Sequence, residues 1–221
     1  MKPLFAALII AFCLTGLNAQ NEAAPAQEKD IVYKDWVFKN VATGRDMNLR
    51  KFTFDKKLVM VVYFAPWCPN WKHDAPVVNR LYEKYKKAGF DVIGVSEYDT
   101  TDAAKANLAS YNVAFPIVSE SELRTDKQKT SHYEYRRSTG DTRSWGSPWY
   151  IFLESTKLEK EGLVLTKRTT VVNGELIEAE IDKMIAEKLG IASKATAELE
   201  KSGKIEICEP DEKTILLEIK P

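Results

Sequence analysis

The side chain in this sequence best suited to chemistry is the thiol of Cys68. It follows a continuous apolar run, residues 58–64, which predicts a strand buried on both faces. From Trp71 to Ala88 apolar residues recur at three and four positions, which predicts a helix. At such a corner, free backbone N–H groups and the helix dipole favour the thiolate, the nucleophilic form of cysteine. Cys68 is therefore a candidate nucleophile, and an unreactive, buried core cysteine is the alternative.

The second feature is the amino terminus, because it predicts the compartment in which the thiol works. An apolar run over residues 4–17, which contains Cys13, follows Lys2 and precedes a small residue, Ala19. The run is shorter than the roughly 20 residues that a membrane span needs. This pattern is typical of a secretory signal peptide over residues 1–19, with an uncleaved anchor as the alternative. We therefore expect a secreted or periplasmic protein without stable membrane insertion after cleavage.

The remaining cysteine, Cys208, lies in a tail over residues 191–221 and is a candidate resolving thiol for Cys68. Two cysteines in an oxidising compartment often pair, but the sequence does not specify whether their Cα atoms approach the ~5.5 Å that a disulfide requires. The chain has two histidines and no cluster of cysteines, so we expect no metal site and no cofactor. Its 32 basic and 32 acidic residues give zero formal net charge, which argues against a nucleic-acid-binding face.

The elements around Cys68 predict an α/β fold with helices on both faces of a sheet. Residues 20–30 are small and polar, which predicts a flexible spacer, and the strand-like pattern over 31–54 contains a turn at 42–44. The domain itself is expected over 31–190, followed by the C-terminal extension over 191–221. Further strands are predicted over 91–96, 115–118, 149–153 and 168–172, and further helices over 101–111, 125–137 and 177–189.

The segment from Phe64 to Pro69, with Pro76 in the following helix and Gly146-Ser147-Pro148 before a strand, resembles a known fold. It is similar to thioredoxin-like proteins of the TlpA/ResA type, which are thiol-disulfide oxidoreductases within the wider AhpC/TSA redoxin group. The resemblance covers roughly residues 35–190. It implies a central mixed sheet with helices on both faces and an N-terminal β-hairpin. It also implies partners that are protein or small-molecule thiols and disulfides, in redox homeostasis or antioxidant activity.

The resemblance also implies roles for particular residues. Cys68 would be the nucleophile, and Asp74 would assist proton transfer, unless it is an ordinary acid favoured by the helix dipole. Pro148 would be cis and pack against the cysteine, and Ser147 would offer backbone groups to an extended substrate. Trp67 and Trp71 would join Trp145 and Trp149 near this groove, although packing in the core is the alternative for at least two of these rings.

One departure from the resemblance concerns the motif itself, which has the pattern Cys-x-x-Cys in the family. Here it is Cys68-Pro69-Asn70-Trp71, so a tryptophan stands where the resolving cysteine is expected. Because the second thiol normally releases the mixed disulfide, three outcomes remain open. Cys68 works as a monothiol with an external thiol, Cys208 resolves it, or the fold is a non-catalytic module that binds peptides or proteins.

Peroxidase chemistry is a weaker alternative, because peroxiredoxins share this fold. They carry Thr or Ser three residues before the reactive cysteine and Pro four residues earlier, where this chain has Ala65 and Val61. The two histidines add no site: both His73 and His132 are predicted to face solvent.

Overall fold

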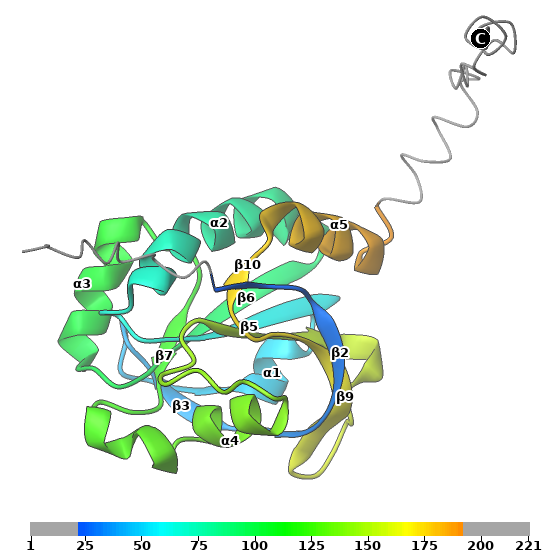
Figure 1. Cartoon of the computed structure of the whole chain (residues 1–221). Helices are drawn as coiled ribbons and strands as arrows, with labels where there is room; N and C mark the ends of the chain where they lie inside the picture. The colour runs from blue at the N-terminus through cyan, green and yellow to red at the C-terminus, as the bar shows by residue number, and fades with distance from the viewer. Residues whose placement is uncertain (1–21, 192–221) are drawn as a thin grey trace, which may run out of the picture.

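The computed structural model describes residues 22–191, and its centre is an eight-stranded mixed sheet (Figure 1). The strand order is β2-β9-β8-β5-β6-β7-β3-β4. A separate parallel pair joins β1 (Ala23–Ala24) to β10 (Glu175–Leu176). The predicted signal peptide with Cys13, and the C-terminal extension with Cys208, lie outside the described residues.

Four strands come first along the described residues, and strands and helices then alternate as far as the strand that starts at Trp149. The strands of the large sheet are β2 (Gln27–Lys34), β3 (Val37–Asn40), β4 (Asp46–Asn48), β5 (Leu58–Phe64), β6 (Phe90–Ser96), β7 (Ile117–Ser119), β8 (Trp149–Glu154) and β9 (Val164–Val172). The helices are α1 (Leu49–Thr53), α2 (Pro69–Tyr85), α3 (Thr101–Tyr111), α4 (Ser131–Ser138) and α5 (Glu178–Lys188). Short 3₁₀ helices cover η1 (Lys86–Ala88), η2 (Arg124–Lys129) and η3 (Ser155–Lys157).

The strand that ends before Cys68 lies at the middle of the sheet. Every residue of β5 is buried, as its unbroken apolar sequence predicts. It pairs in parallel with β6 and antiparallel with β8, and β9 pairs antiparallel with β8. The carboxyl end of β5 therefore lies beside the start of β8, so the chain before β8 comes close to the chain after β5.

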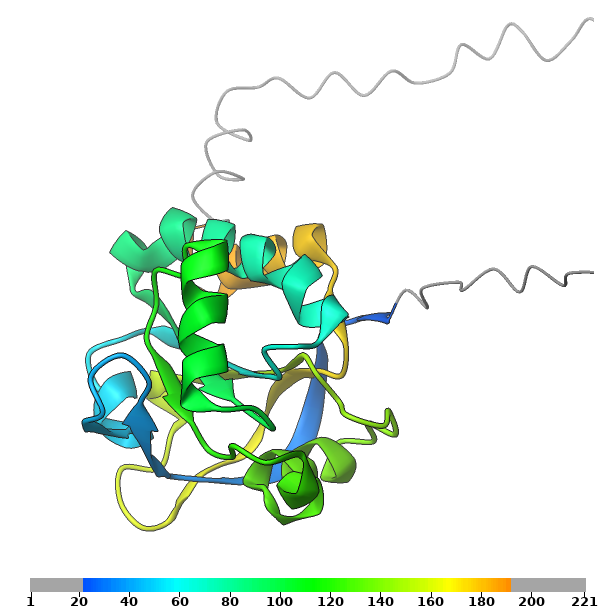
Figure 2. The ribbon, with the colours of Figure 1, turned by 90° about the vertical axis from the view of Figure 1, so that its left-hand side faces the viewer.

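Helices cover both faces of the sheet, which confirms the predicted layers (Figures 1 and 2). Side chains of β5 at positions 58, 60, 62 and 64 share one core with residues of α2, α3 and α5. The alternate positions 59, 61 and 63 share a second core with residues of α1 and α4. This division follows from the pleat, since successive side chains of a strand point to opposite faces.

The helix predicted over 71–88 is present as α2, which starts two residues earlier at Pro69, and η1, which continues it to Ala88. Cys68 is the N-cap residue, with extended backbone angles, and Pro69 occupies the first turn, where its missing N–H group is not needed. After η1 the chain turns at Gly89, whose φ of 100° is left-handed and suits glycine. The N-terminal end of α2 therefore lies directly against the carboxyl end of β5.

Three local predictions need correction or refinement. The flexible spacer predicted over 20–30 is wrong for β1 and for residues 27–30, because β2 pairs with β9 along this stretch. Backbone pairing at a sheet edge does not require apolar side chains, so its polar composition was misleading. The strand-like region 31–54 contains the expected hairpin, β3 with β4, but ends in helix α1, which Asn48 caps. The helix predicted over 125–137 is divided into η2 and α4.

Candidate active site

The thiol of Cys68 lies at the corner between β5 and α2 and faces the loop before β8. The residue is 7% exposed, and within residues 22–191 it is a free cysteine. Its Sγ donates a hydrogen bond to the backbone oxygen of Ser147, at 3.2 Å. Its own N–H donates to the oxygen of Ala65 at 2.9 Å, which closes the turn after the strand. The thiol is therefore held at the helix start, against one carbonyl group of another segment.

That carbonyl group belongs to the residue before a cis-proline. The Ser147–Pro148 peptide bond is cis, the isomer that was expected there. The Ser147 hydroxyl oxygen accepts a hydrogen bond from the N–H of Ala65 at 2.8 Å. Two hydrogen bonds thus join the two segments, one through each polar group of Ser147. The sequence motifs around Cys68 and Pro148, distant along the chain, form one structural unit.

A buried histidine of α4, His132, contacts the loop before Pro148, although the sequence predicted this histidine at the surface. His132 is completely buried, stacks on Tyr63 with ring centroids 5.1 Å apart, and lies 3.1 Å from the oxygen of Gly146 through Nε2. Its Nδ1 lies 3.0 Å from the hydroxyl of Tyr98. Burial and the nearby Arg136 charge lower its pKa well below the usual value, so the ring is neutral. A neutral ring that donates from Nε2 to Gly146 accepts from Tyr98 at Nδ1.

Arg136, one turn further along α4, holds the same loop. Its guanidinium donates to the backbone oxygens of Arg143 and Ser144, at 2.7 and 3.1 Å, and the side chain is 1% exposed. A Cβ atom at Gly146 would collide with the Arg136 side chain, and the φ of 61° there also favours glycine. The spacing of His132 and Arg136, four residues apart on a predicted helix, was the only signal in the sequence for this arrangement.

Asp74 is placed inside the molecule, away from the direct contacts of the thiol. It is completely buried, and its Oδ2 accepts from the Tyr150 hydroxyl at 2.6 Å and from the N–H of Leu176 at 2.9 Å. Burial raises its pKa, while these hydrogen bonds act in the opposite direction. Six residues of helix separate it from Cys68, about 9 Å along the axis. Its carboxyl group therefore links α2 to β8 and β10.

The four tryptophans divide into two groups. Trp71 and Trp149 are completely buried, and their indole N–H groups donate to Asn107 and Asn173 at 2.8 and 2.7 Å. Trp71 also stacks on the ring of Phe64, with centroids 4.2 Å apart, so the role predicted for it in substrate contact is wrong for this structure. Trp71 is buried because its ring faces the apolar core between α2 and the sheet. Core packing, the alternative interpretation, applies to these two rings.

The other two tryptophans are half-buried and touch each other beside the thiol. The rings of Trp67 and Trp145 lie edge to face, with centroids 5.0 Å apart. Trp67 immediately precedes Cys68, and Trp145 lies two residues before Ser147. This pair therefore spans the same two segments that the Ser147 hydrogen bonds join.

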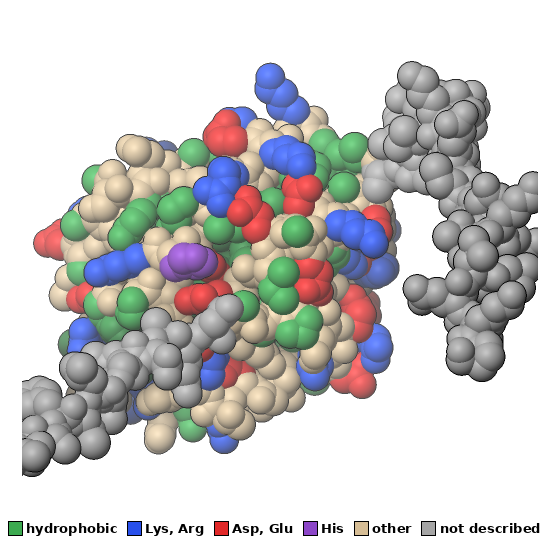
Figure 3. All heavy atoms as spheres, turned by 45° about the horizontal axis from the view of Figure 1, so that its top comes forward, with side chains coloured by type: hydrophobic (Ala, Val, Ile, Leu, Met, Phe, Trp, Pro, Cys, Tyr) green, Lys and Arg blue, Asp and Glu red, His purple; other side chains and the backbone are tan. Residues whose placement is uncertain are grey.

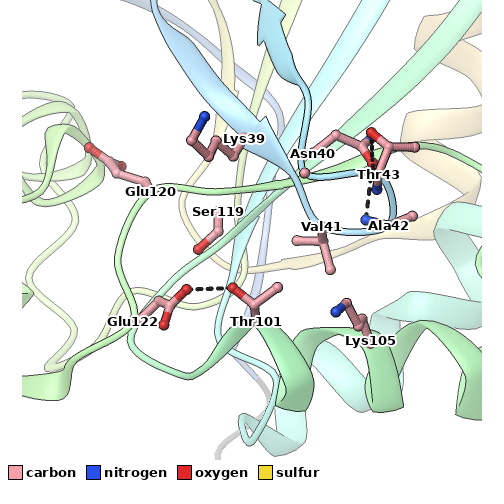
Figure 4. Close-up of a pocket in the computed structure, with 11 residues that line it drawn as sticks. Lys39, Asn40, Val41, Ala42, Thr43, Thr101, Lys105, Ser119, Glu120 and Glu122 are labelled. Carbon is pink, nitrogen blue, oxygen red and sulfur yellow. Dashed lines mark hydrogen bonds between the residues drawn. The ribbon is translucent and has the colours of Figure 1, made fainter.

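A cavity of about 500 Å³ lies elsewhere, between the β3–β4 turn, the start of α3 and the end of β7 (Figure 4). Lys39 and Lys105 line it from different elements, and Glu122 accepts a hydrogen bond from Thr101 at one side. Cys68 does not line this cavity, so it is separate from the site around the thiol.

The architecture and this site together define a class of protein. A parallel β5–α2–β6 unit, a cysteine at the start of α2 and a cis-proline opposite it are features of thioredoxin-like redox proteins. A solved structure with the same fold is a secreted thiol-disulfide isomerase from Corynebacterium glutamicum, with a TM-score of 0.53 and 16% identity, covering 75% of this chain and 92% of that one.

The chain belongs to the AhpC/TSA family, whose model matches residues 29–145. Human protein disulfide-isomerase A2 is 37% identical over 100 residues, which are 45% of this chain and 18% of that protein. The thiol-disulfide oxidoreductase ResA of Bacillus cereus (strain ATCC 10987) is 30% identical over 74 residues, 34% of this chain and 42% of ResA. Peroxiredoxin Q of Sedum lineare is 29% identical over 126 residues, 55% of this chain and 58% of that protein. The matched region thus spans less than two thirds of each relative.

Among residues 22–191, no helix combines the length and apolar character needed to cross a bilayer.

Proposed function

We propose that this protein carries out thiol-disulfide exchange through Cys68, as a monothiol, in an extracytoplasmic compartment. One observation supports this above all: the Cys68 thiol lies at the N-terminus of α2 and faces the carbonyl group of Ser147, the residue before the cis-proline. A helix N-terminus, with its free backbone N–H groups, is a position where a reactive cysteine is commonly found. The AhpC/TSA family and the similarity to ResA support redox chemistry.

The proposed step is a single exchange of sulfur partners. The Cys68 thiolate attacks one sulfur of a substrate disulfide, a new Cys68–substrate disulfide forms, and the other substrate sulfur leaves as a thiolate that takes up a proton from water. Ser147 positions the thiol through its backbone oxygen and, through Pro148, presents the segment beside which an extended substrate lies. Trp67 contributes the adjacent apolar wall.

Release of this mixed disulfide requires a second thiol, and α2 does not supply one. Trp71 occupies the position three residues after Cys68 and points into the core. We therefore propose that an external thiol resolves the intermediate, with Cys208 of the C-terminal extension as the alternative. We also propose that a signal peptide is cleaved after residue 19 and that residues 31–190 form the redox domain. Asp74 enters it as a residue that positions α2, and a direct proton transfer by its carboxyl group stays a prediction.

Mass spectrometry of the protein treated with 2-hydroxyethyl disulfide tests this proposal. We expect one mixed disulfide, mapped to the Cys68 peptide, which persists until an external thiol is added. Cys68→Ser should form no adduct at that peptide. Cys208→Ser should behave like the unmodified protein; if its adduct lives much longer, Cys208 is the resolving thiol. No adduct at Cys68 would contradict the proposal.

The second candidate is a non-catalytic module that binds extended peptides. The half-buried Trp67–Trp145 pair favours it, because such rings provide apolar contact area next to polar backbone groups. Peptide binding that survives Cys68→Ser, together with an unreactive thiol, would support this candidate. Peroxidase activity has less support, because Ala65 offers no hydroxyl group beside the thiol.

A further inference from the structure

We infer that the Cys68 site selects disulfides that carry carboxylate groups next to the sulfur atoms, through two cations, Arg124 and Lys127, held on the tryptophans beside the thiol. This inference rests on the proposed function and specifies its substrate class. It does not depend on how the mixed disulfide is later resolved.

The geometry that carries the inference is a rim of four side chains: Trp67, Trp145, Arg124 and Lys127. The guanidinium carbon of Arg124 lies 4.4 Å from the centre of the Trp67 ring. The ammonium nitrogen of Lys127 lies 4.5 Å from the centre of the Trp145 ring. Both distances fall within the range of attractive cation–π contacts. Trp67 precedes Cys68 directly, and its ring contacts the ring of Trp145. These contacts therefore hold two positive charges on the pair of tryptophans next to Cys68.

Among residues 22–191, Arg124 and Lys127 are cations without an acidic partner, as Lys51 and Lys72 also are. Within residues 22–191, neither Arg124 nor Lys127 forms an ion pair at 4.0 Å or less. On the face formed by α2 and α5, positive and negative side chains are intermixed (Figure 3). There Arg80 pairs with Glu178 at 2.7 Å, and Lys84 pairs with Asp182 at 2.6 Å. The rim is therefore a place where positive charge remains available to a ligand.

The acids nearest to the rim along the chain have other hydrogen-bond partners. Asp126, between the two cations in sequence, pairs with Lys129 at 2.9 Å. Glu122 accepts a hydrogen bond from Thr101. Glu120 accepts one from the N–H of Ser131 at 2.6 Å, and Asp141 pairs with Arg143 at 2.8 Å. These acids reduce the positive potential at a distance but do not neutralise the two cations by contact.

The expected effect is electrostatic and therefore has a defined size and salt dependence. Exposed charges act over roughly 8 Å at physiological ionic strength and about 30 Å at 0.01 M. We expect a carboxylate beside the scissile disulfide to be attracted by both cations and an ammonium group there to be repelled. We expect an on-rate effect on the order of ten-fold at low salt, because steering by surface charge acts mainly on association.

The test compares three small disulfides that differ in charge: dithiodiglycolate, which is dianionic, 2-hydroxyethyl disulfide, which is neutral, and cystamine, which is dicationic. Each rate with Cys68 is divided by the rate of the same disulfide with a free cysteine peptide, to remove its intrinsic reactivity. We expect dithiodiglycolate to react about ten times faster than cystamine at 10 mM salt, with the ratio approaching one at 1 M.

Variants assign this preference to the rim. The double variant Arg124→Gln/Lys127→Gln should bring the anion-to-cation rate ratio close to one at low salt. A matched control, Lys160→Gln/Lys167→Gln, removes two exposed lysines near and within β9, away from the site, and should leave all three rates unchanged. Equal rate ratios for the unmodified protein with both the small disulfides and the peptide disulfides, or a ratio that survives the double variant, would overturn the inference.

Two further substrates distinguish a protein disulfide from a small-molecule disulfide as the natural substrate. A peptide disulfide with glutamates beside its cysteine is compared with the same peptide carrying lysines. A charge preference with peptides alone indicates protein substrates, and one with the small disulfides indicates a small anionic thiol; each result supports the inference. If Cys68 reacts with none of the probes, the proposed function fails. If it reacts with all of them without charge order, only the inference fails.

Discussion

The two segments that meet at the site are specified in different ways. The turn around Cys68, residues 65–69, is closed by its own backbone and by Pro69 at the start of α2. The loop before β8, residues 143–148, is instead held from outside, by His132 and Arg136 of α4. One side of the site is therefore local in sequence, and the other depends on side chains of a separate helix.

This difference indicates which substitutions should disturb the geometry of the site. The thiol needs only the carboxyl end of β5 and the first turn of α2 to be placed at a helix N-terminus. The carbonyl group of Ser147 that faces it needs a loop that contains Gly146 in a left-handed conformation, against a buried arginine. Substitutions in the turn should change chemistry or the core beneath it, whereas substitutions in α4 should shift the loop and change the reaction indirectly.

The largest effect is expected under the Cys68 turn, at Trp71. Trp71→Cys removes a completely buried indole and should lower the free energy of unfolding by about 3–4 kcal/mol, as large-to-small core substitutions do. It also supplies a second thiol three residues after Cys68, so the mixed disulfide with 2-hydroxyethyl disulfide should be released without an external thiol. Urea unfolding measures the first effect and mass spectrometry the second.

Trp71→Ala is the matched control, because it leaves a similar cavity without a thiol. If both variants release the mixed disulfide equally, the release comes from loosened packing and not from the new cysteine.

The next effect is expected in the externally held loop. Arg136→Met keeps much of the side-chain volume but removes the donors to the Arg143 and Ser144 carbonyl groups. Leaving two buried acceptors unsatisfied should lower the free energy of unfolding by about 2–3 kcal/mol. Arg137→Met, on the exposed face of the same helix, should change it by less than about 1 kcal/mol. Equal effects in urea unfolding would contradict the role given to Arg136.

A third, smaller effect depends on pH through His132. Because its pKa is lowered in the folded state, unfolding takes up a proton at the ring as pH falls below about 6.5, and stability is lost in that window. The unmodified protein should therefore lose about 1 kcal/mol between pH 7 and pH 5.5 that His132→Gln does not lose. His73→Gln, at an exposed histidine, serves as the comparison. Identical pH dependence of unfolding in the unmodified protein and His132→Gln would contradict a buried neutral ring.

The smallest effect is expected at Asp74, and its sign is opposite. Its raised pKa favours the protonated form in the folded state, so stability falls as pH rises from about 4 through the raised value. Asp74→Asn, which does not titrate, should gain on the unmodified protein by about 1 kcal/mol or less between pH 4 and pH 7. An altered pH profile for the Cys68 reaction in this variant would instead give the carboxyl group a direct part in proton transfer.

The sequence predicted the local half of the site better than the remote half. The strand over 58–64, the helix that follows and the place of Cys68 between them depend on patterns within about 30 residues, and these were confirmed. The cis isomer of Pro148 was expected only through the resemblance, and the hydrogen bonds of Ser147 with Ala65 and Cys68 were not predicted. The exposed position predicted for His132 was wrong, because its burial depends on packing of α4 against Tyr63 of β5 and Trp149 of β8.

The roles of the tryptophans depend on their burial, which the amino-acid composition does not predict. Four tryptophans near one motif were compatible with a substrate groove, yet two of them fill the cores on opposite faces of the sheet. The spacing of Trp67 and Trp71 does not distinguish them. Trp67 lies in the turn before α2 and is half-buried, whereas Trp71 lies in the first turn of α2 and is completely buried. The polar segment 27–30 was misassigned for the converse reason, because strand pairing at an edge leaves no apolar pattern.

The central claim is that the fold makes Cys68 more reactive than an ordinary cysteine, and one measurement tests it directly. The rate of alkylation by iodoacetamide is determined at pH 7 for the Cys68 peptide, in the native protein and in the protein unfolded in urea, with peptide mapping to separate the cysteines. The account predicts native alkylation on the order of ten times faster than in the unfolded chain. A native rate equal to or below the unfolded rate would contradict it.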